Sequence, residues 1–466
     1  MFFIEKLKTF TKLSYDSLKD FLYGYAPNPV TTKNGLVIGG GLMYPEINFT
    51  LPPMEINQNT MDAIKKQYTE ILEGVLKRAR ELHAPGIIVE VELLPPMTEH
   101  PKWGIEIHKT VRDIMYEHEA KYGLKSALRI TPNDVRENIR PPFMRGGANW
   151  DAMMETFTGC AKDGADFLAI ESTGGKEIHD GALMNADISQ VIFALGIMGV
   201  RDMGNLWKHI SDIAIKEGSI ASGDTACGFG NTAMVLADRG FIPKVFAAVV
   251  RVATVSRSLV AYEMGAVGPS KDCAYEGPYM KAIAGVPIAM EGKSSSCAHL
   301  SPLGNIAAAV ADLWSNESVQ NIRLLGGMAP VVSMEQLIYD CRLMNQAMKS
   351  GKENALRMQQ WLTDSDSKLD PQAYVLRPDI VYQISKEIVK EKDSFIRTKR
   401  SAQIAIDVLR QALAKDEVII DPREYKWLDI MESQIAEIPD EEEAFWRKIK
   451  GSLDLTKFLP SEYGLS

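Results

Sequence analysis

The sequence predicts a protein of the α/β class, folded as a closed (β/α)8 TIM barrel with an extension at each end. Short apolar runs alternate with helix-length segments over about 250 residues, a pattern typical of parallel sheets. The number and spacing of these runs favour a barrel over a doubly wound open sheet, which stays open as the alternative. The chain of 466 residues is long enough for a barrel with added segments.

Three ranges differ in their patterns. Residues 1–85 are expected to form an N-terminal extension, with extended pieces rich in Gly and Pro and an amphipathic helix over 59–82. Residues 86–350 are expected to form the catalytic barrel. Residues 351–466 are charged and mostly helical by their period, which indicates a C-terminal helical extension packed on the barrel.

Seven runs qualify as barrel strands. A long helix is expected over 246–263 and another over 304–313, and an eighth strand is sought within 240–265. The seven runs are 86–93, 126–131, 167–172, 219–224, 266–271, 286–291 and 322–327.

Composition and charge exclude several functions. Lys and Arg number 52 and Asp and Glu 61, so the net charge of −9 argues against nucleic acid or an anionic membrane as the main partner. No apolar run approaches the roughly 20 residues of a membrane span, so no membrane segment is expected. Five cysteines are too few for a disulfide framework. We therefore expect a cytoplasmic protein in which cysteine binds metal or acts as a nucleophile.

Glu171, Cys227 and Cys273 each follow a different predicted strand. Because the strands of a barrel end at one mouth, these side chains are expected to meet there. Two thiolates and a carboxylate suit Zn²⁺, and three protein ligands leave the open position that a catalytic site needs. The alternative is that the cysteines are small buried hydrophobic residues and the glutamate is a surface charge.

Three other motifs are candidates for functional sites. GFGNTA at 228–233 matches a nucleotide-binding pattern, but no acidic residue ends a strand about 20 positions later, which favours a simple turn. Cys297 and His299 are of the types found in a nucleophile and its base, or they belong to an ordinary loop. Lys176 and His179 are candidates for shaping the mouth of the site.

Four strings of unusual composition occur in a fixed order. They are RPPFMRGG at 140–147, ESTGGKEIHD at 171–180, GDTACGFGNTAM at 223–234 and KDCAYEGPYMKAI at 271–283. With them the sequence resembles, over nearly its whole length, the methanol–corrinoid methyltransferases of methanogens and acetogens, in particular the methanol-activating subunit family known as MtaB.

This resemblance implies a TIM barrel that holds one catalytic zinc ion through Glu171, Cys227 and Cys273. It implies transfer of the methyl group of methanol to Co(I) of a corrinoid (a cobalamin) carried by a separate protein, giving methyl-Co(III) and water in methanogenesis or acetogenesis. The expected partners are the corrinoid protein and methanol. A homodimer of this subunit within a larger complex is also expected.

Asp224 and Glu276 are candidates for a supporting role in this chemistry. Hydroxide is a poor leaving group, because the pKa of water is ~15.7. Two thiolates and a carboxylate around Zn²⁺ leave a net charge of −1, so metal polarisation alone is not expected to suffice. Both acids lie near ligands in the sequence and are candidates for a proton donor or for orienting the ligands. Ordinary capping or turn roles are the alternative.

The chain is expected to need a separate corrinoid protein. None of the seven histidines has an Asp two positions before it, so the chain lacks the Asp-x-His-x-x-Gly loop that would hold its own corrinoid.

Two alternative functions stay open. A zinc methyltransferase with another small methyl donor or a thiol acceptor is one alternative, although its His-x-Cys pattern is missing because His299 follows Cys297. The other is a non-catalytic barrel that binds the corrinoid protein around a structural zinc, a kind of site that usually has four protein ligands.

Overall fold

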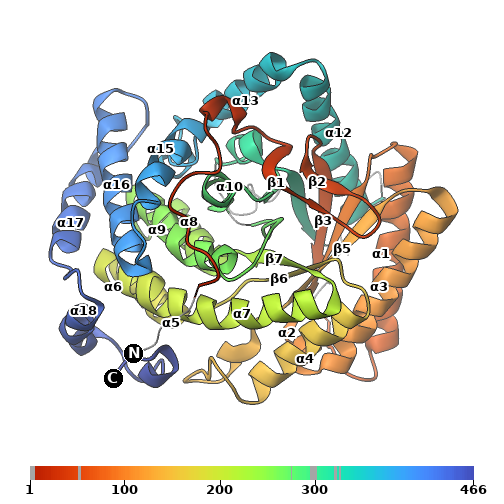
Figure 1. Ribbon diagram of the computed structural model, residues 1–466, viewed down its shortest axis with the longest axis horizontal. Helices are drawn as coiled ribbons and strands as arrows, with labels where there is room; N and C mark the ends of the chain where they lie inside the picture. The colour runs from red at the N-terminus through yellow and green to blue at the C-terminus, as the bar shows by residue number, and fades with distance from the viewer. Residues whose placement is uncertain (1–5, 51–53, 274, 294–301, 320–322, 325–326) are drawn as a thin grey trace.

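The computed structural model describes residues 6–50, 54–273, 275–293, 302–319, 323–324 and 327–466. A curled sheet of seven parallel strands lies at its centre, and helices surround the sheet (Figure 1). In spatial order the strands are β7 (Ile220–Asp224), β6 (Phe167–Ile170), β5 (Ser126–Pro132), β4 (Ile87–Leu93), β3 (Tyr44–Thr50), β9 (Leu313–Val319) and β8 (Ala289–Glu291).

An irregular extended segment closes the barrel between β7 and β8. Val267 N donates to Ala221 O of β7 at 2.8 Å, and Ser270 N donates to Pro287 O, just before β8, at 3.2 Å. Pro269 has no N–H to donate, so this segment forms no regular ladder. The predicted (β/α)8 barrel is thus confirmed, with 266–271 in one strand position as an irregular piece.

Two strands of the barrel were missed or misplaced by the sequence analysis. β3 lies between β4 and β9, so the sheet begins inside the range 1–85 that was assigned to an N-terminal extension. β9 follows a short 3-10 helix, Ile306–Val310, where a longer helix was expected. Both strands carry polar residues that face the barrel interior, and this weakens the apolar signal.

Two other expectations were wrong. The search for an eighth strand in 240–265 fails because α9 (Lys244–Glu263) fills that range. The range 322–327 contributes no barrel strand among its described residues. These belong to the two-residue strands β10 (Arg323–Leu324) and β11 (Gly327–Met328), which pair with each other antiparallel and not with the barrel.

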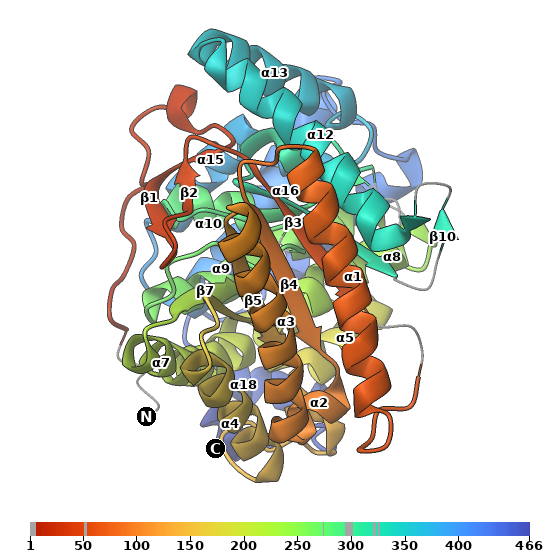
Figure 2. The ribbon, with the colours of Figure 1, turned by 90° about the vertical axis from the view of Figure 1, so that its right-hand side faces the viewer.

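Helices cover the outside of the barrel. Figure 2 shows the first two of them, α1 and α3, lying over β3, β4 and β5. The barrel helices are α1 (Met61–Glu81), α3 (Pro101–Tyr122), α4 (Ala148–Lys162), α7 (Val200–Glu217), α9, α10 (Gly277–Ala284) and α12 (Ala329–Lys349). Shorter helices in the loops are α2 (Pro95–Glu99), α5 (Lys176–Asn185), α6 (Ile188–Phe193) and α8 (Thr232–Asp238).

The remaining helices form the predicted C-terminal helical part. They are α13 (Lys352–Asp366), α14 (Pro371–Tyr374), α15 (Pro378–Ile388), α16 (Ser394–Ala414), α17 (Tyr425–Ala436) and α18 (Glu442–Ile449). α16 packs along α9, so the second helix layer lies on one side of the barrel (Figure 1). Of the described helices, α9 alone is long and apolar enough to cross a membrane, which the sequence analysis did not recognise, and it is completely buried as core helices are.

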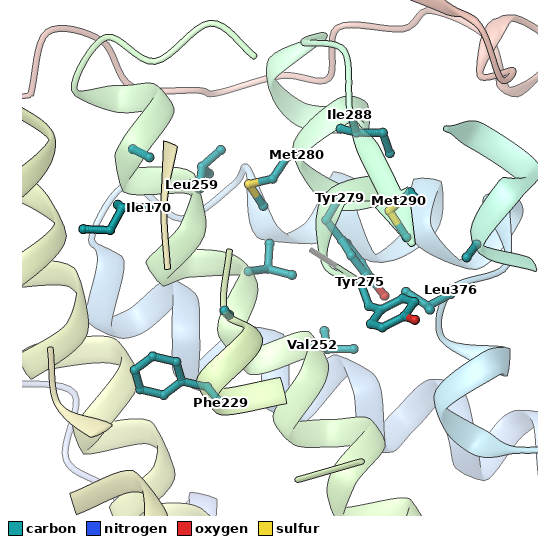
Figure 3. Packing of buried hydrophobic residues seen from close by; sticks show 14 of the residues in the cluster. Ile170, Phe229, Val252, Leu259, Tyr275, Tyr279, Met280, Ile288, Met290 and Leu376 are labelled. Atoms are coloured by element: carbon teal, nitrogen blue, oxygen red, sulfur yellow. The ribbon is translucent and has the colours of Figure 1, made fainter. Parts of the chain in front are cut away.

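The barrel interior changes character along its axis. The layer nearer the amino ends of the strands, called the lower layer here, is apolar. The hairpin of β1 (Tyr25–Thr31) and β2 (Val37–Gly40) packs against it. Outside the barrel strands a second, larger core joins the helices and includes Val252 and Leu259 of α9 and Tyr279 of α10 (Figure 3). The members of the lower layer are Tyr44, Ile88, Ala127, Phe167, Ala289 and Leu313.

Candidate metal centre

Three side chains meet at the carboxyl ends of the barrel strands. Glu171 follows β6 directly, Cys227 opens a π-helical turn after β7 and Cys273 follows the irregular eighth segment. Their ligand atoms all lie within 4.8 Å of one another, and the Cys273 thiol donates to Glu171 Oε1 at 2.8 Å. The structure therefore brings together the three residues that the sequence analysis selected.

The pKa of each of the three groups is raised in this setting, so a cation beside them would favour their ionised forms. Desolvation raises the pKa of Glu171 to about 7, although the Lys271 ammonium opposes the shift. A hydrogen bond with Cys273 lowers the pKa of Cys227, but burial and Glu171 outweigh it and raise that pKa to about 12. The same hydrogen bond and burial raise the pKa of Cys273 well above its usual range. Since Zn²⁺ deprotonates a coordinating thiol and accepts sulfur and oxygen, this donor set fits a zinc ion.

Buried carboxylates hold the backbone beside each of the three groups. A charged acceptor makes such hydrogen bonds stronger than those between neutral groups, so the ligand loops are held firmly. The carboxylate–amide pairs are Asp224 with Ser172 N (3.2 Å), Glu276 with Ala226 N (2.7 Å) and Asp272 with Cys273 N (2.9 Å).

Asp224 and Glu276 lie behind the ligand loops. Asp224 Oδ2 accepts from Trp207 Nε1 at 2.9 Å, so both of its oxygens already have donors. Glu276 Oε1 accepts from the Ser258 hydroxyl at 2.7 Å as well as from the loop amide, and burial raises the pKa of this carboxyl. Neither acid belongs to the described groups of ligand atoms that lie within 4.8 Å of one another.

The loop after Glu171 is tied to a buried ion-pair network. The Thr173 amide and hydroxyl both donate to Asp134 Oδ2, at 2.9 and 3.0 Å. Asp134 and Asp202 flank the fully buried Arg136 guanidinium, each at 2.7 Å. Because an unpaired charge at this depth would be costly, the network keeps the loop in one position.

C-terminal residues contact the loop that follows Glu171 and the segment 144–145, and the sequence analysis missed these contacts. The Tyr463 hydroxyl accepts from Gly175 N at 3.1 Å. Glu462 Oε2 accepts from the amides of Met144 and Arg145, at 2.9 and 3.0 Å. Gly175 has a φ of +87°, and a Cβ at this position would lie 2.8 Å from Ala194 O. No sequence pattern indicates these contacts, because the partners are hundreds of residues apart.

The other candidate residues have simpler surroundings. Lys176 pairs with Asp180 at 2.6 Å, and His179 is buried with its ring edge-on to Phe229 at 5.0 Å. The GFGNTA stretch forms the π-helical turn and the start of α8, as the turn interpretation predicts. Cys297 and His299 lie outside the described residues.

A cleft of about 490 Å³ opens at the opposite end of the barrel. Its lining includes Pro45 near the start of β3, Pro85 just before β4 and Arg342 of α12. Pro45 and Pro85 are at the amino ends of their strands, so this cleft is separate from the three ligand groups. In barrels of this kind the active site lies at the carboxyl ends of the strands.

The fold and the site together define a TIM-barrel protein with a thiol–thiol–carboxylate cluster at the mouth of the barrel. Residues 7–464 match the family described as the methanol-cobalamin methyltransferase B subunit. The chain belongs to this family and is a methyltransferase.

Two relatives span almost the whole chain. A methanol–corrinoid protein co-methyltransferase from Methanosarcina barkeri (strain Fusaro / DSM 804) is 36% identical over 464 residues, which is 98% of this chain and 99% of that protein. The crystal structure of the methanol:cobalamin methyltransferase complex from Methanosarcina barkeri contains a chain that is 34% identical, with a TM-score of 0.93. That match covers 98% of this chain and 100% of the other.

Proposed function

We propose that this protein transfers the methyl group of methanol to Co(I) of a corrinoid carried by a separate protein, with Zn²⁺ held by Glu171, Cys227 and Cys273. The observation that carries the proposal is the convergence of these three groups within 4.8 Å at the carboxyl end of the barrel. The names of the two relatives support the substrate and the type of acceptor.

The zinc ion, when bound, supplies Lewis acidity, on the order of several kcal/mol of stabilisation for negative charge that develops on the alcohol oxygen. The overall reaction breaks the C–O bond of methanol, forms a Co–C bond and consumes one proton to release water. The three side chains would hold the ion, and a set of three protein ligands is typical of a catalytic rather than a structural zinc site. The residues behind them keep those side chains in place.

Asp224 and Glu276 act in this proposal as positioning residues. Each accepts a hydrogen bond from the amide beside one ligand, Ser172 N or Ala226 N. Residues that orient metal ligands in this way typically change metal affinity or activity by about 10–100-fold when they are removed. The proton-donor interpretation predicts a different response to amide substitution.

The corrinoid protein docks, in this proposal, over the mouth of the barrel and so covers the site. A partner is required because the sequence lacks the Asp-x-His-x-x-Gly loop. Covering the mouth keeps water away from reactive Co(I). We also expect a homodimer within the larger complex and a cytoplasmic location, where Cys227 and Cys273 stay reduced.

Purified protein with its zinc quantified, mixed with cob(I)alamin and methanol, tests the proposal. The corrinoid absorption spectrum should change from that of Co(I) to that of methyl-Co(III). A small methoxy compound in place of methanol, and methylcobalamin with a thiol, test the alternative donor and acceptor. Cys273→Ala should abolish the reaction, whereas Cys160→Ala, at a buried cysteine on α4, should retain it. A zinc-loaded wild-type protein that leaves Co(I) unchanged would disprove the proposal.

A further inference from the structure

A lysine lies beneath the candidate metal centre with no exposure to solvent. Lys271 Nζ is 2.5 Å from Asp272, 2.7 Å from Glu92 and 3.0 Å from Glu90. It is also 3.5 Å from Glu171 Oε1, so one ammonium group contacts a predicted zinc ligand and three other carboxylates. Lys271, Glu90 and Asp272 are all completely buried.

The three other carboxylates form an arrangement that suits a cation. One oxygen each of Glu90, Glu92 and Asp272 lies within 4.8 Å of the other two. We call these residues the acidic triad. Glu90 Oε2 and the neighbouring Asn48 Oδ1 are buried and accept no hydrogen bond from the described residues. Oxygen donors grouped in this way are what hard cations such as Mg²⁺, Mn²⁺ and Ca²⁺ bind.

We propose that Lys271 is a positioning residue whose ammonium serves as the built-in cation of the acidic triad and fixes Glu171 for metal binding. It occupies the place that a second metal ion would otherwise take, next to the Glu171, Cys227 and Cys273 site. The inference rests on the proposed function, since it concerns the zinc ligand Glu171.

The geometry distinguishes this role from that of an ordinary buried ion pair. Lys281 on α10 is equally buried, but it contacts a single carboxylate, Asp312 at 2.9 Å, and two backbone carbonyls. Lys271 in contrast links the acidic triad to the ligand loop. Removing its charge leaves three carboxylates close together whose other cationic neighbour, Arg129, already pairs with Glu46, a state that protonation or a new cation relieves.

Lys271→Met tests the proposal in the zinc-loaded protein. We expect zinc release to a chelator to be about 10–100-fold faster than in the wild type, because Glu171 loses its partner. We also expect the variant to bind one equivalent of Mn²⁺, measured by electron paramagnetic resonance, and Mn²⁺ to slow zinc release again. Lys271→Arg should keep the charge and bind no Mn²⁺. Lys281→Met, the matched control, should lose stability without either effect.

The outcomes separate the two proposals. A wild-type protein that holds no zinc contradicts the proposed function itself. A wild-type protein that holds zinc, next to a Lys271→Met variant with unchanged zinc release and no Mn²⁺ binding, overturns only the role of Lys271. If Lys271→Met does not fold, the zinc-loaded wild-type protein provides the second test. It should bind no Mn²⁺ beside its zinc, because Lys271 occupies the acidic triad, and one equivalent of bound Mn²⁺ would overturn the role.

Discussion

The two ends of the barrel interior differ in chemistry although the same strands build both. Moving two residues along a strand keeps a side chain on the same face, yet the residue type changes from apolar to charged or polar. The pairs are Tyr44 and Glu46, Ile88 and Glu90, Ala127 and Arg129, Ala289 and Glu291, and Leu313 and Ser315. One layer thus stabilises the barrel and the next one supports the chemistry.

The charged layer is expensive to maintain and the apolar layer offsets its cost. Arg129 and Glu46 are both fully buried and pair at 2.7 Å, and such pairs add little net stability because both ions lose their hydration. The apolar layer below gains free energy from every buried side chain. Substitutions in the two layers should therefore separate activity from stability.

The largest effect on activity is expected from Cys227→Ala. The variant should lose zinc and all methyl transfer, because one of the three predicted zinc ligands is gone. Its melting temperature without metal should equal that of the metal-free wild type, since the thiol lies at the mouth and not in the core. A large drop in that melting temperature would indicate a structural metal site. The residues at the mouth of the barrel would then contribute to stability as the apolar layer does.

Leu313→Ala tests the apolar layer. Removing a fully buried leucine should lower the free energy of unfolding by about 2–5 kcal/mol. The activity per folded, zinc-loaded molecule should be unchanged. Denaturation and turnover assays on the same sample measure the stability and the activity. Ile88→Val, a smaller deletion in the same layer, should cost about 0.5–1.5 kcal/mol. If either variant changes turnover strongly, the layers are not independent.

Glu276→Ala should reduce turnover by about 10–100-fold with zinc retained, because Ala226 N loses its acceptor. Glu276→Gln keeps an oxygen at that position, so a positioning role predicts a loss below about tenfold. A proton donor would instead lose its function equally in both variants. Comparing kcat for the two substitutions at equal zinc content therefore decides between the two roles.

The pH dependence of zinc uptake should reveal Glu171. Both thiols must lose a proton before they bind zinc. The affinity for zinc should therefore fall by about 100-fold for each unit by which the pH is lowered. Because the pKa of Glu171 is about 7 in the metal-free protein, its proton must also leave below that pH. The dependence should therefore steepen by about tenfold per pH unit below pH 7. Competition titrations measure this, and Glu171→Gln should show no steepening.

Tyr463→Phe should have the smallest effect. It removes the acceptor of Gly175 N, a change on the order of 1 kcal/mol, so turnover should fall by at most about fivefold. Tyr279→Phe is the matched control, because its hydroxyl donates to Val375 O at 2.6 Å, away from the site loop. Equal turnover in both variants would argue that the loop after Glu171 does not depend on the hydrogen bond to Tyr463.

The sequence predicts the barrel strands that are mostly apolar and misses those in which polar residues interrupt the pattern throughout. β6 is a continuous apolar run, and β4 opens with three apolar residues before Glu90. β3 and β9 place Glu46, Asn48 and Ser315 inside the barrel, so their pattern resembles that of a loop. The charged interior layer is thus the physical reason why both strands were overlooked.

Residue types at strand ends, together with the family resemblance, were enough to select Glu171, Cys227 and Cys273. The carboxylate–amide pairs behind them were not predictable as contacts. Glu276 and Ala226, for example, are 50 residues apart and meet only because the barrel closes through an irregular segment. Spacing along a chain carries no information about such encounters.

The bond between Tyr463 and Gly175 joins residues 288 positions apart. A minimal enzyme obtained by trimming the chain to its barrel, ending near residue 350, would therefore lose a hydrogen bond that holds the loop after Glu171, along with the outer helices. Engineers who wish to shorten this scaffold would first have to supply a new acceptor for the glycine amide and new partners for Met144 and Arg145.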